Sequence, residues 1–181
     1  GEPAAYKIGT QGKISIVPTD KWDAFLLGGY PSTVEVVNVN PSGEVETPAP
    51  GTTFSFKASN AQVYLPLARV GRCFYFAIEG KLWSWPLSSE WQPVDRPRAR
   101  PDVKAQSVWT GVHNDLYVVL DDSEMDGTGK KIVSHNFRVA QFKPDGNGNP
   151  GKAVFTSQLF EHQTCSSITA DETSGLIYVE C

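Results

Sequence analysis

The sequence is poor in cysteine, histidine, methionine and positive charge, and it has no long apolar run. Among its 181 residues are three cysteines, three histidines and one methionine. No apolar segment approaches the roughly 18 residues of a membrane-spanning helix, so we expect no membrane insertion. The 16 lysine and arginine residues are outnumbered by 20 aspartate and glutamate residues. Because nucleic acids bind clustered positive charge, we expect no nucleic-acid partner.

Catalytic signatures are missing as well. The sequence contains no HExxH zinc motif, no GxSxG nucleophile motif and no phosphate-binding loop. His113 has Asp115 close by, His135 stands alone, and His162 directly follows Glu161. If Glu161 and His162 lie within a strand, they point to opposite faces and do not act together. We therefore expect no cofactor and favour binding over catalysis, while a triad assembled from distant residues stays open.

Glycine, proline and aromatic residues are abundant instead. The chain has 16 glycines, 13 prolines and an aromatic share of 11%. This composition suits short strands joined by tight turns and is poor material for long helices. Hydrophobic residues make up 40% of the chain, which is enough for a core. The sequence predicts one all-β domain that spans residues 1–181, a usual length for a single domain.

Short strand-like segments recur along the chain. Four are rich in aromatic or branched residues and are bounded by turn residues: residues 24–29, 73–78, 115–120 and 176–181. Alternating strands at 34–39 and 137–142 each lead into an x-Pro-(Ser/Asp)-Gly turn. The spacing indicates a unit of roughly 50 residues, which is in the range of propeller blades. We predict a small β-propeller of about four short blades, the last completed by residues 13–17, with a β-sandwich or barrel as the alternative.

Parts of this pattern resemble known families. The blades of lactonase-type β-propellers are similar to three stretches: residues 25–43 (FLLGG … VEVVNVNPSG), 137–146 and 167–179. This resemblance implies a propeller fold and a lactonase or cyclase activity in a polar pocket at one end. The stretch from Phe54 to Phe76 is similar to fungal secreted cell-wall and elicitor-like proteins, which are compact β-domains. The second resemblance implies a secreted recognition protein.

The cysteines predict a disulfide. Their spacing matches no zinc motif, since none lies within a few residues of another. Cys165 and Cys181 flank a predicted hairpin with strands at 166–169 and 176–179. Antiparallel pairing places the two cysteines opposite each other to within one residue of register, which is close enough for a bond. We therefore predict a Cys165–Cys181 disulfide and export to an oxidising compartment, and we expect Cys73 to be an inert core thiol.

Aromatic residues provide candidate binding sites. A two-residue turn at Glu79–Gly80 predicts a hairpin in which Phe76 faces Trp83 and Phe74 faces Trp85. This aromatic face is either part of the core or a platform for sugar rings. Further aromatic residues are predicted in loops: Trp22, Tyr30, Trp91 and Trp109. Exposed aromatic side chains beside polar ones commonly hold a carbohydrate or a partner protein, so we take these four as candidate binding residues.

Two acidic loops have the appearance of calcium loops. They are residues 121–127 and 145–150. The twelfth position of a calcium loop requires a bidentate glutamate, whereas the twelfth positions counted from Asp122 and Asp145 are Val133 and Thr156. We interpret both as solvated turns and expect no metal.

Taken as a whole, the sequence favours a secreted recognition protein that is either lectin-like or similar to elicitor and effector proteins. Its expected partner is a glycan or a surface protein of a cell wall or host. The alternative is an enzyme of lactonase or cyclase type, which rests on the first resemblance.

Overall fold

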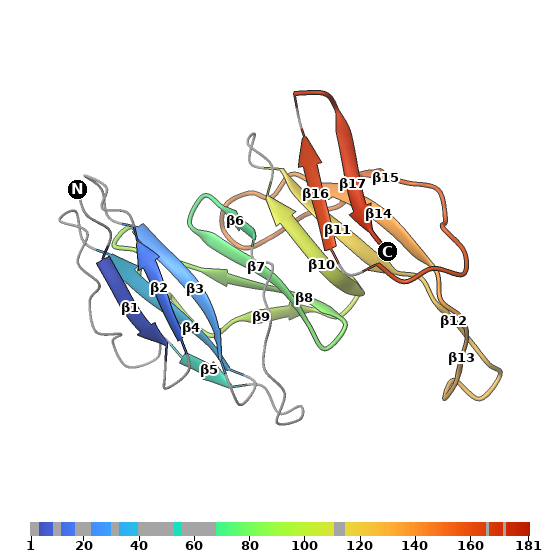
Figure 1. Cartoon of the computed structure of the whole chain (residues 1–181), viewed down its shortest axis with the longest axis horizontal. Helices are drawn as coiled ribbons and strands as arrows, with labels where there is room; N and C mark the ends of the chain where they lie inside the picture. Colours follow the sequence, from blue (N-terminus) through green and yellow to red (C-terminus); the bar gives the residue numbers. More distant parts are fainter. Residues whose placement is uncertain are drawn as a thin grey trace. The chain divides into compact units, whose positions relative to one another are not determined.

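A computed structural model describes most of the chain. The described residues are 4–8, 12–16, 23–29, 33–39, 53–55, 68–110, 115–165, 167–171 and 173–181. They form strands and turns, and none of them lies in a helix, so the predicted all-β class is confirmed (Figure 1). The chain divides into two compact units. The first unit is Gly1–Leu65 with Pro86–Pro97, and the second is Pro66–Trp85 with Arg98–Cys181.

The first unit holds two small antiparallel sheets. Its strands are β1 (Ala4–Ile8) and β2 (Gly12–Ile16) in one sheet, and β3 (Asp23–Gly29), β4 (Thr33–Val39) and β5 (Thr53–Ser55) in the other. Val34 and Val36, alternate residues of β4, are fully buried. β2 pairs with β1 rather than with the C-terminal strands, so the predicted fourth sheet that combines both chain ends is wrong. Pairing with a neighbour in sequence closes a shorter loop and costs less entropy.

The second unit contains two four-stranded antiparallel sheets. The first sheet has the order β6 (Ala68–Val70), β7 (Cys73–Ile78), β8 (Lys81–Pro86) and β9 (Arg98–Arg100). The second sheet has the order β10 (Ala105–Thr110), β11 (Leu116–Asp121), β14 (Phe137–Phe142) and β15 (Ala153–Thr156). A hairpin of β12 (Glu124–Met125) and β13 (Ile132–Ser134) is inserted between β11 and β14 and projects away from the sheet (Figure 1).

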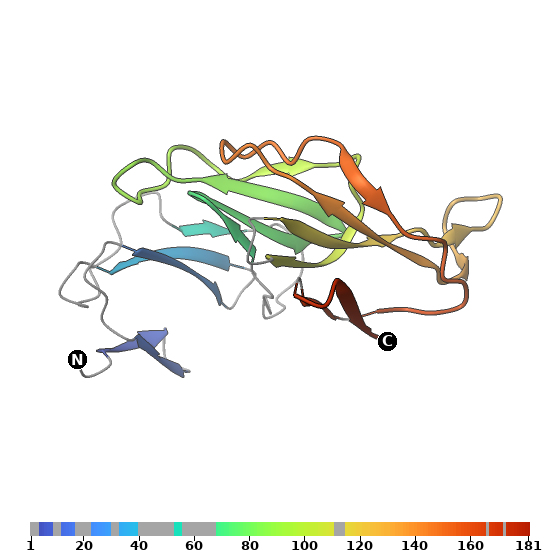
Figure 2. The same ribbon diagram turned by 90° about the horizontal axis from the view of Figure 1, so that it is seen from above.

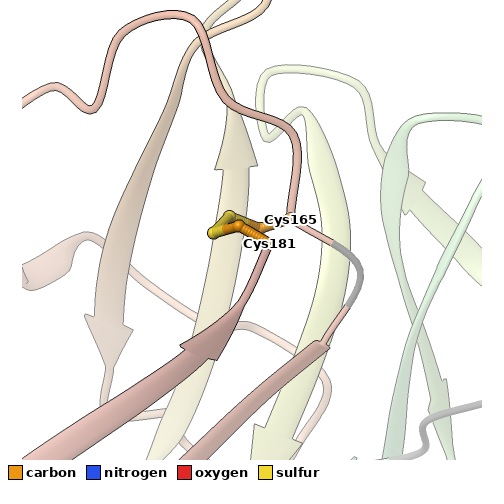
Figure 3. Close-up of a disulfide and its surroundings, with 2 residues drawn as sticks. All are labelled: Cys165 and Cys181. Carbon is orange, nitrogen blue, oxygen red and sulfur yellow. A yellow bond between two sulfur atoms is a disulfide. The ribbon is translucent and has the colours of Figure 1, made fainter.

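A third, two-stranded sheet completes the second unit. It consists of β16 (Ser167–Asp171) and β17 (Leu176–Glu180). β16 lies against β10 and β11, and Figure 2 shows this hairpin as a layer of its own beside the second sheet. The Cys165–Cys181 disulfide is confirmed, with Cα atoms 4.0 Å apart just outside the paired strands (Figure 3). Ala170 lies opposite Ile177, and Asp171 lies opposite Leu176 at the turn.

The core of the second unit lies between stacked sheets. Val118 of β11 belongs to the cluster between the first and second sheets, which also includes Tyr75 and Leu82. Its neighbour Val119 belongs to the cluster between the second and third sheets, which includes Ile168. Successive residues of a strand point to opposite faces. The second sheet is therefore covered on both faces, which explains the continuous apolar run of β11.

Candidate functional site

Four residues form a cross-strand row on the second sheet. Trp109 of β10 lies opposite Tyr117 of β11, Tyr117 opposite Gln141 of β14, and Gln141 opposite Phe155 of β15. Residues that lie opposite each other on neighbouring strands share a face. Tyr117 belongs to the cluster that packs against the third sheet, so the row lies on that face. Trp109 and Phe155, at its two ends, are 37% and 48% exposed.

Trp109 was predicted in a loop, and this part of the prediction is wrong. The residue belongs to β10, where its side chain alternates with the buried Val108. The alternation puts Val108 in the core between the first and second sheets and leaves Trp109 on the partly open opposite face.

A cavity of about 400 Å3 opens beside this row. Its lining comes from the row, from the start of β11 and from the β16–β17 hairpin: Asp115, Tyr117, Gln141, Phe155, Ala170, Asp171, Gly175, Leu176 and Ile177. The second sheet has four strands, whereas the third has two and lies against β10 and β11. The cavity is therefore a consequence of strand number, because the two-stranded third sheet lies against β10 and β11 and does not extend over β15.

Asp115 gives the cavity a fixed, buried carboxylate. The residue directly precedes β11 and is 8% exposed. Its Oδ2 accepts a hydrogen bond of 2.8 Å from Nε2 of Gln141, a member of the cross-strand row. Charged side chains are rarely this buried unless they are paired, because they lose hydration. A carboxylate held by a neutral amide at a cavity wall is therefore a candidate ligand-binding group.

Asp171 contributes a second carboxylate from the end of β16. It accepts hydrogen bonds from the backbone N–H of Thr173 at 3.0 Å and from the Ser174 hydroxyl at 2.8 Å. The Ser174 hydroxyl, helped by the backbone N–H groups of the turn, holds the pKa of Asp171 below its ordinary value. Among the described residues that line the cavity, none is lysine, arginine or histidine. The described lining of the cavity therefore carries two acidic side chains and no basic one.

The chemistry of the walls suits a small polar molecule with an apolar face. Phe155, Leu176 and Ile177 provide aromatic and aliphatic surface. Asp115 and Gln141 provide polar atoms held in a defined orientation by their mutual hydrogen bond. Binding sites for small molecules typically combine an apolar lining with a few polar groups that fix orientation.

Trp91 lies in the first unit, in the turn that follows β8. Its backbone N–H donates to Ser88 O at 3.0 Å, and Ser88 N donates to Gln92 O at 2.8 Å. The residue has φ 63°, a left-handed conformation that glycine ordinarily occupies in three-residue hairpin turns. A bulky residue in this conformation costs about 1–3 kcal/mol. Such strain is a reason to retain Trp91 as a candidate binding residue. Two of the other predicted binding residues, Trp22 and Tyr30, lie outside the described residues.

The predicted aromatic hairpin belongs to the core. Phe74, Phe76 and Trp85 are almost completely buried. The rings of Phe76 and Trp83 are stacked, with centroids 6.4 Å apart and an interplanar angle of 1°. Trp83 is half-buried, and its indole N–H donates to Ile78 O at 3.0 Å. Of the two interpretations of this face, the core is confirmed and the exposed sugar platform is wrong.

His162 belongs to a loop network, and neither His162 nor His135 lines the cavity. His162 Nδ1 lies 3.2 Å from the Ser134 hydroxyl, which donates to Oδ1 of Asn136 at 2.8 Å. Because Ser134 gives its proton to Asn136, His162 donates to Ser134 and does not act as its base. The backbone N–H of His162 also donates to Asn136 Oδ1. His135 is exposed, and His113 lies outside the described residues.

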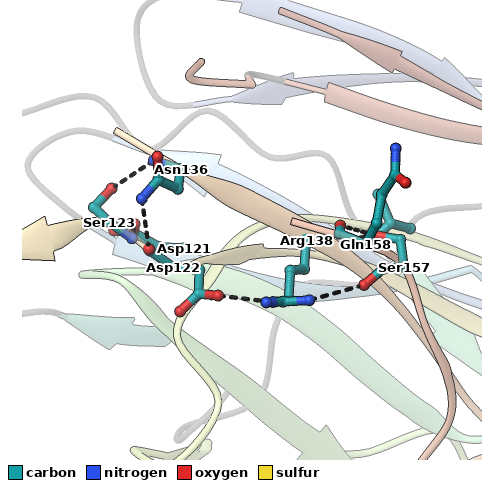
Figure 4. A network of polar contacts seen from close by, with 8 residues as sticks. Asp121, Asp122, Ser123, Asn136, Arg138, Ser157 and Gln158 are labelled. Carbon is teal, nitrogen blue, oxygen red and sulfur yellow. Dashed lines mark hydrogen bonds and ion pairs between the residues drawn. The ribbon is translucent and has the colours of Figure 1, made fainter. Parts of the chain in front are cut away.

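The carboxylates of the acidic loops bond either to a neighbouring strand or to their own turns. Asp122 forms an ion pair of 2.8 Å with Arg138, which also donates to Ser157 O (Figure 4). Asp126 accepts four hydrogen bonds within its turn, and Asp145 accepts two. Across the described part of the chain, no group of three or more His, Cys, Asp or Glu residues is placed to hold a metal ion.

Sequence reasoning missed most of the cavity. Gln141 is a polar residue within the otherwise apolar end of an alternating strand, and that exception is a signal that a sequence can give. Asp115 was noted only as a neighbour of His113, although a carboxylate at the start of a buried strand is unusual. Phe155 and Asp171 carried no such signal, because their importance depends on strands that are distant in sequence.

Comparison with protein-family models, with curated proteins and with solved structures gives no match to this chain. Within the described segments, no helix has the length and apolar character needed to cross a membrane.

Proposed function

We propose that this chain is a secreted recognition protein that binds a carbohydrate in the cavity between its second and third sheets. The observation that carries the proposal is the combination, in one cavity, of exposed Phe155 with the buried carboxylate of Asp115, which the half-buried Gln141 holds. A sugar ring has apolar C–H faces and a rim of hydroxyl groups. The aromatic wall fits the first feature, and the oriented carboxylate and amide fit the second.

We also infer that the stacked sheets are built like the blades of a β-propeller. Two features support this inference: the first and second sheets are both four-stranded antiparallel sheets, and the second is covered on both faces. A two-layer sandwich would leave one face of each sheet in solvent. The Cys165–Cys181 disulfide supports export, because such bonds persist in oxidising compartments.

The proposal is tested by screening the purified protein and two variants on a glycan array. Phe155→Ala removes the aromatic wall of the cavity. The matched control is Val154→Ala, which changes the adjacent residue of β15, is 57% exposed and does not line the cavity. We expect Phe155→Ala to weaken the specific hits at least about tenfold, since aromatic anchors commonly contribute more than the 1.4 kcal/mol that tenfold represents.

Val154→Ala should leave these hits unchanged. An array without any hit, or hits that survive Phe155→Ala at full strength, would show that the cavity is not a carbohydrate site.

A further inference from the structure

We propose that the ligand of the cavity is an amino sugar with a free, positively charged amine. This inference rests on the proposed carbohydrate recognition and names the class of sugar. It comes from two properties of the cavity: its charge and the balance of its hydrogen-bonding atoms.

The charge of the cavity has one sign. Asp115 and Asp171 both line it, and its other described lining residues carry no charge. Asp115 is almost fully buried, so its carboxylate is poorly hydrated. A positive charge beside it is therefore attracted more strongly than a positive charge beside a carboxylate on an open surface. Asp122, beyond the opposite end of β11 from Asp115, pairs with Arg138 and does not line the cavity. An incoming ammonium group would offset the charge of one carboxylate of the cavity.

The polar atoms of the cavity are mainly acceptors. An ionised carboxylate accepts hydrogen bonds and donates none. Nε2 of Gln141 uses one of its two hydrogens to donate to Asp115, which leaves one N–H as a donor and the carbonyl oxygen of Gln141 as an acceptor. An ammonium group offers three donors and no acceptor. An acetylated amine offers one donor, carries no charge and adds bulk, so it fits this set of atoms less well.

The test compares three oligosaccharides that differ at one position. They are β-1,4-linked oligomers of glucosamine, N-acetylglucosamine and glucose of equal length, which carry an amine, an acetamide or a hydroxyl at C2. Each is titrated calorimetrically into the oxidised full chain at neutral pH and moderate salt. We expect the glucosamine oligomer to bind at least tenfold more tightly than either of the others.

Charge-removing variants locate the effect. Asp115→Asn keeps the size of the side chain and should reduce the amine preference to threefold or less. Asp122→Asn is the control, because this carboxylate is 51% exposed, pairs with Arg138 and lies outside the cavity. Asp171→Asn, at an exposed turn, provides a second test if the buried variant fails to fold.

The outcomes separate the two proposals. If all three oligomers bind equally and Phe155→Ala abolishes their binding, carbohydrate recognition is supported and the amine preference is overturned. Absence of binding by all three would overturn both. Equal loss of the amine preference in Asp115→Asn and Asp122→Asn would show a general attraction to an acidic chain and would also overturn the amine site.

Discussion

At the scale of single residues, the left-handed positions are the most informative. Glu79 and Gly80 have φ 55° and 68°, the conformation of a two-residue hairpin turn that favours Asn-Gly. Glu79→Asn should therefore raise the free energy of unfolding by about 0.5–1 kcal/mol, since asparagine tolerates this conformation better. Urea unfolding measures the change, with Glu90→Asn, an exposed residue without positive φ, as the control. A decrease in stability would contradict the assigned turn.

Trp91 presents two alternatives that one substitution separates. Trp91→Gly removes the side chain and relieves a left-handed conformation, so the two effects on stability oppose each other. If the Trp91 ring is not part of the core, the free energy of unfolding should change by less than about 1 kcal/mol. Urea unfolding measures the change. A loss of more than about 3 kcal/mol, typical of a truncated core aromatic, would show that the ring serves the core.

Cys73 has the properties of an inert core thiol, as predicted. It is fully buried, and this burial raises the pKa of the thiol to about 11. The reactive thiolate is therefore scarce at pH 8. We expect no alkylation of Cys73 in the native protein and complete alkylation in urea, as measured by peptide mass spectrometry. Rapid labelling of the native protein would place Cys73 at a surface and contradict the packing of the first sheet.

At the scale of elements, the disulfide holds the narrow third sheet. The two cysteines are separated by 16 residues. Cross-linking a loop of this length stabilises a folded chain by about 3 kcal/mol. Reduction, or a Cys165→Ser/Cys181→Ser variant, should therefore speed amide hydrogen exchange in β16 and β17 well before β7 or β11. The double variant should be insensitive to reductant, and unchanged exchange in β16 and β17 after reduction would contradict this role.

Strands were predictable where local sequence decides them. Cys73–Ile78 and Phe137–Phe142 match their predicted bounds, because apolar runs and turn residues delimit them. The disulfide was predictable because both cysteines lie next to the ends of one hairpin. The cross-strand row was not predictable, because an inserted hairpin separates β11 from β14 and hides their pairing.

At the scale of the whole molecule, the cavity follows from a count of strands. In the second unit, two four-stranded sheets are followed by the two-stranded sheet of β16 and β17. This narrow sheet lies against β10 and β11, and the cavity lies beside Gln141 of β14 and Phe155 of β15. No local sequence pattern indicates this difference in strand number. The sequence therefore predicted binding residues among the tryptophans and not at Phe155 or Asp115. The chain is acidic, with a formal net charge of −4, and this agrees in sign with the proposed cationic ligand.

The central claim is that a carbohydrate occupies this cavity, and hydrogen exchange with and without a bound oligosaccharide tests it most directly. Peptides that cover β14–β15 and the β16–β17 turn should exchange more slowly when the sugar is bound. Peptides of β6–β9 should be unaffected, because none of their residues lines the cavity. Protection confined to the turn of Trp91, or to the first sheet, would place the ligand elsewhere and contradict the account.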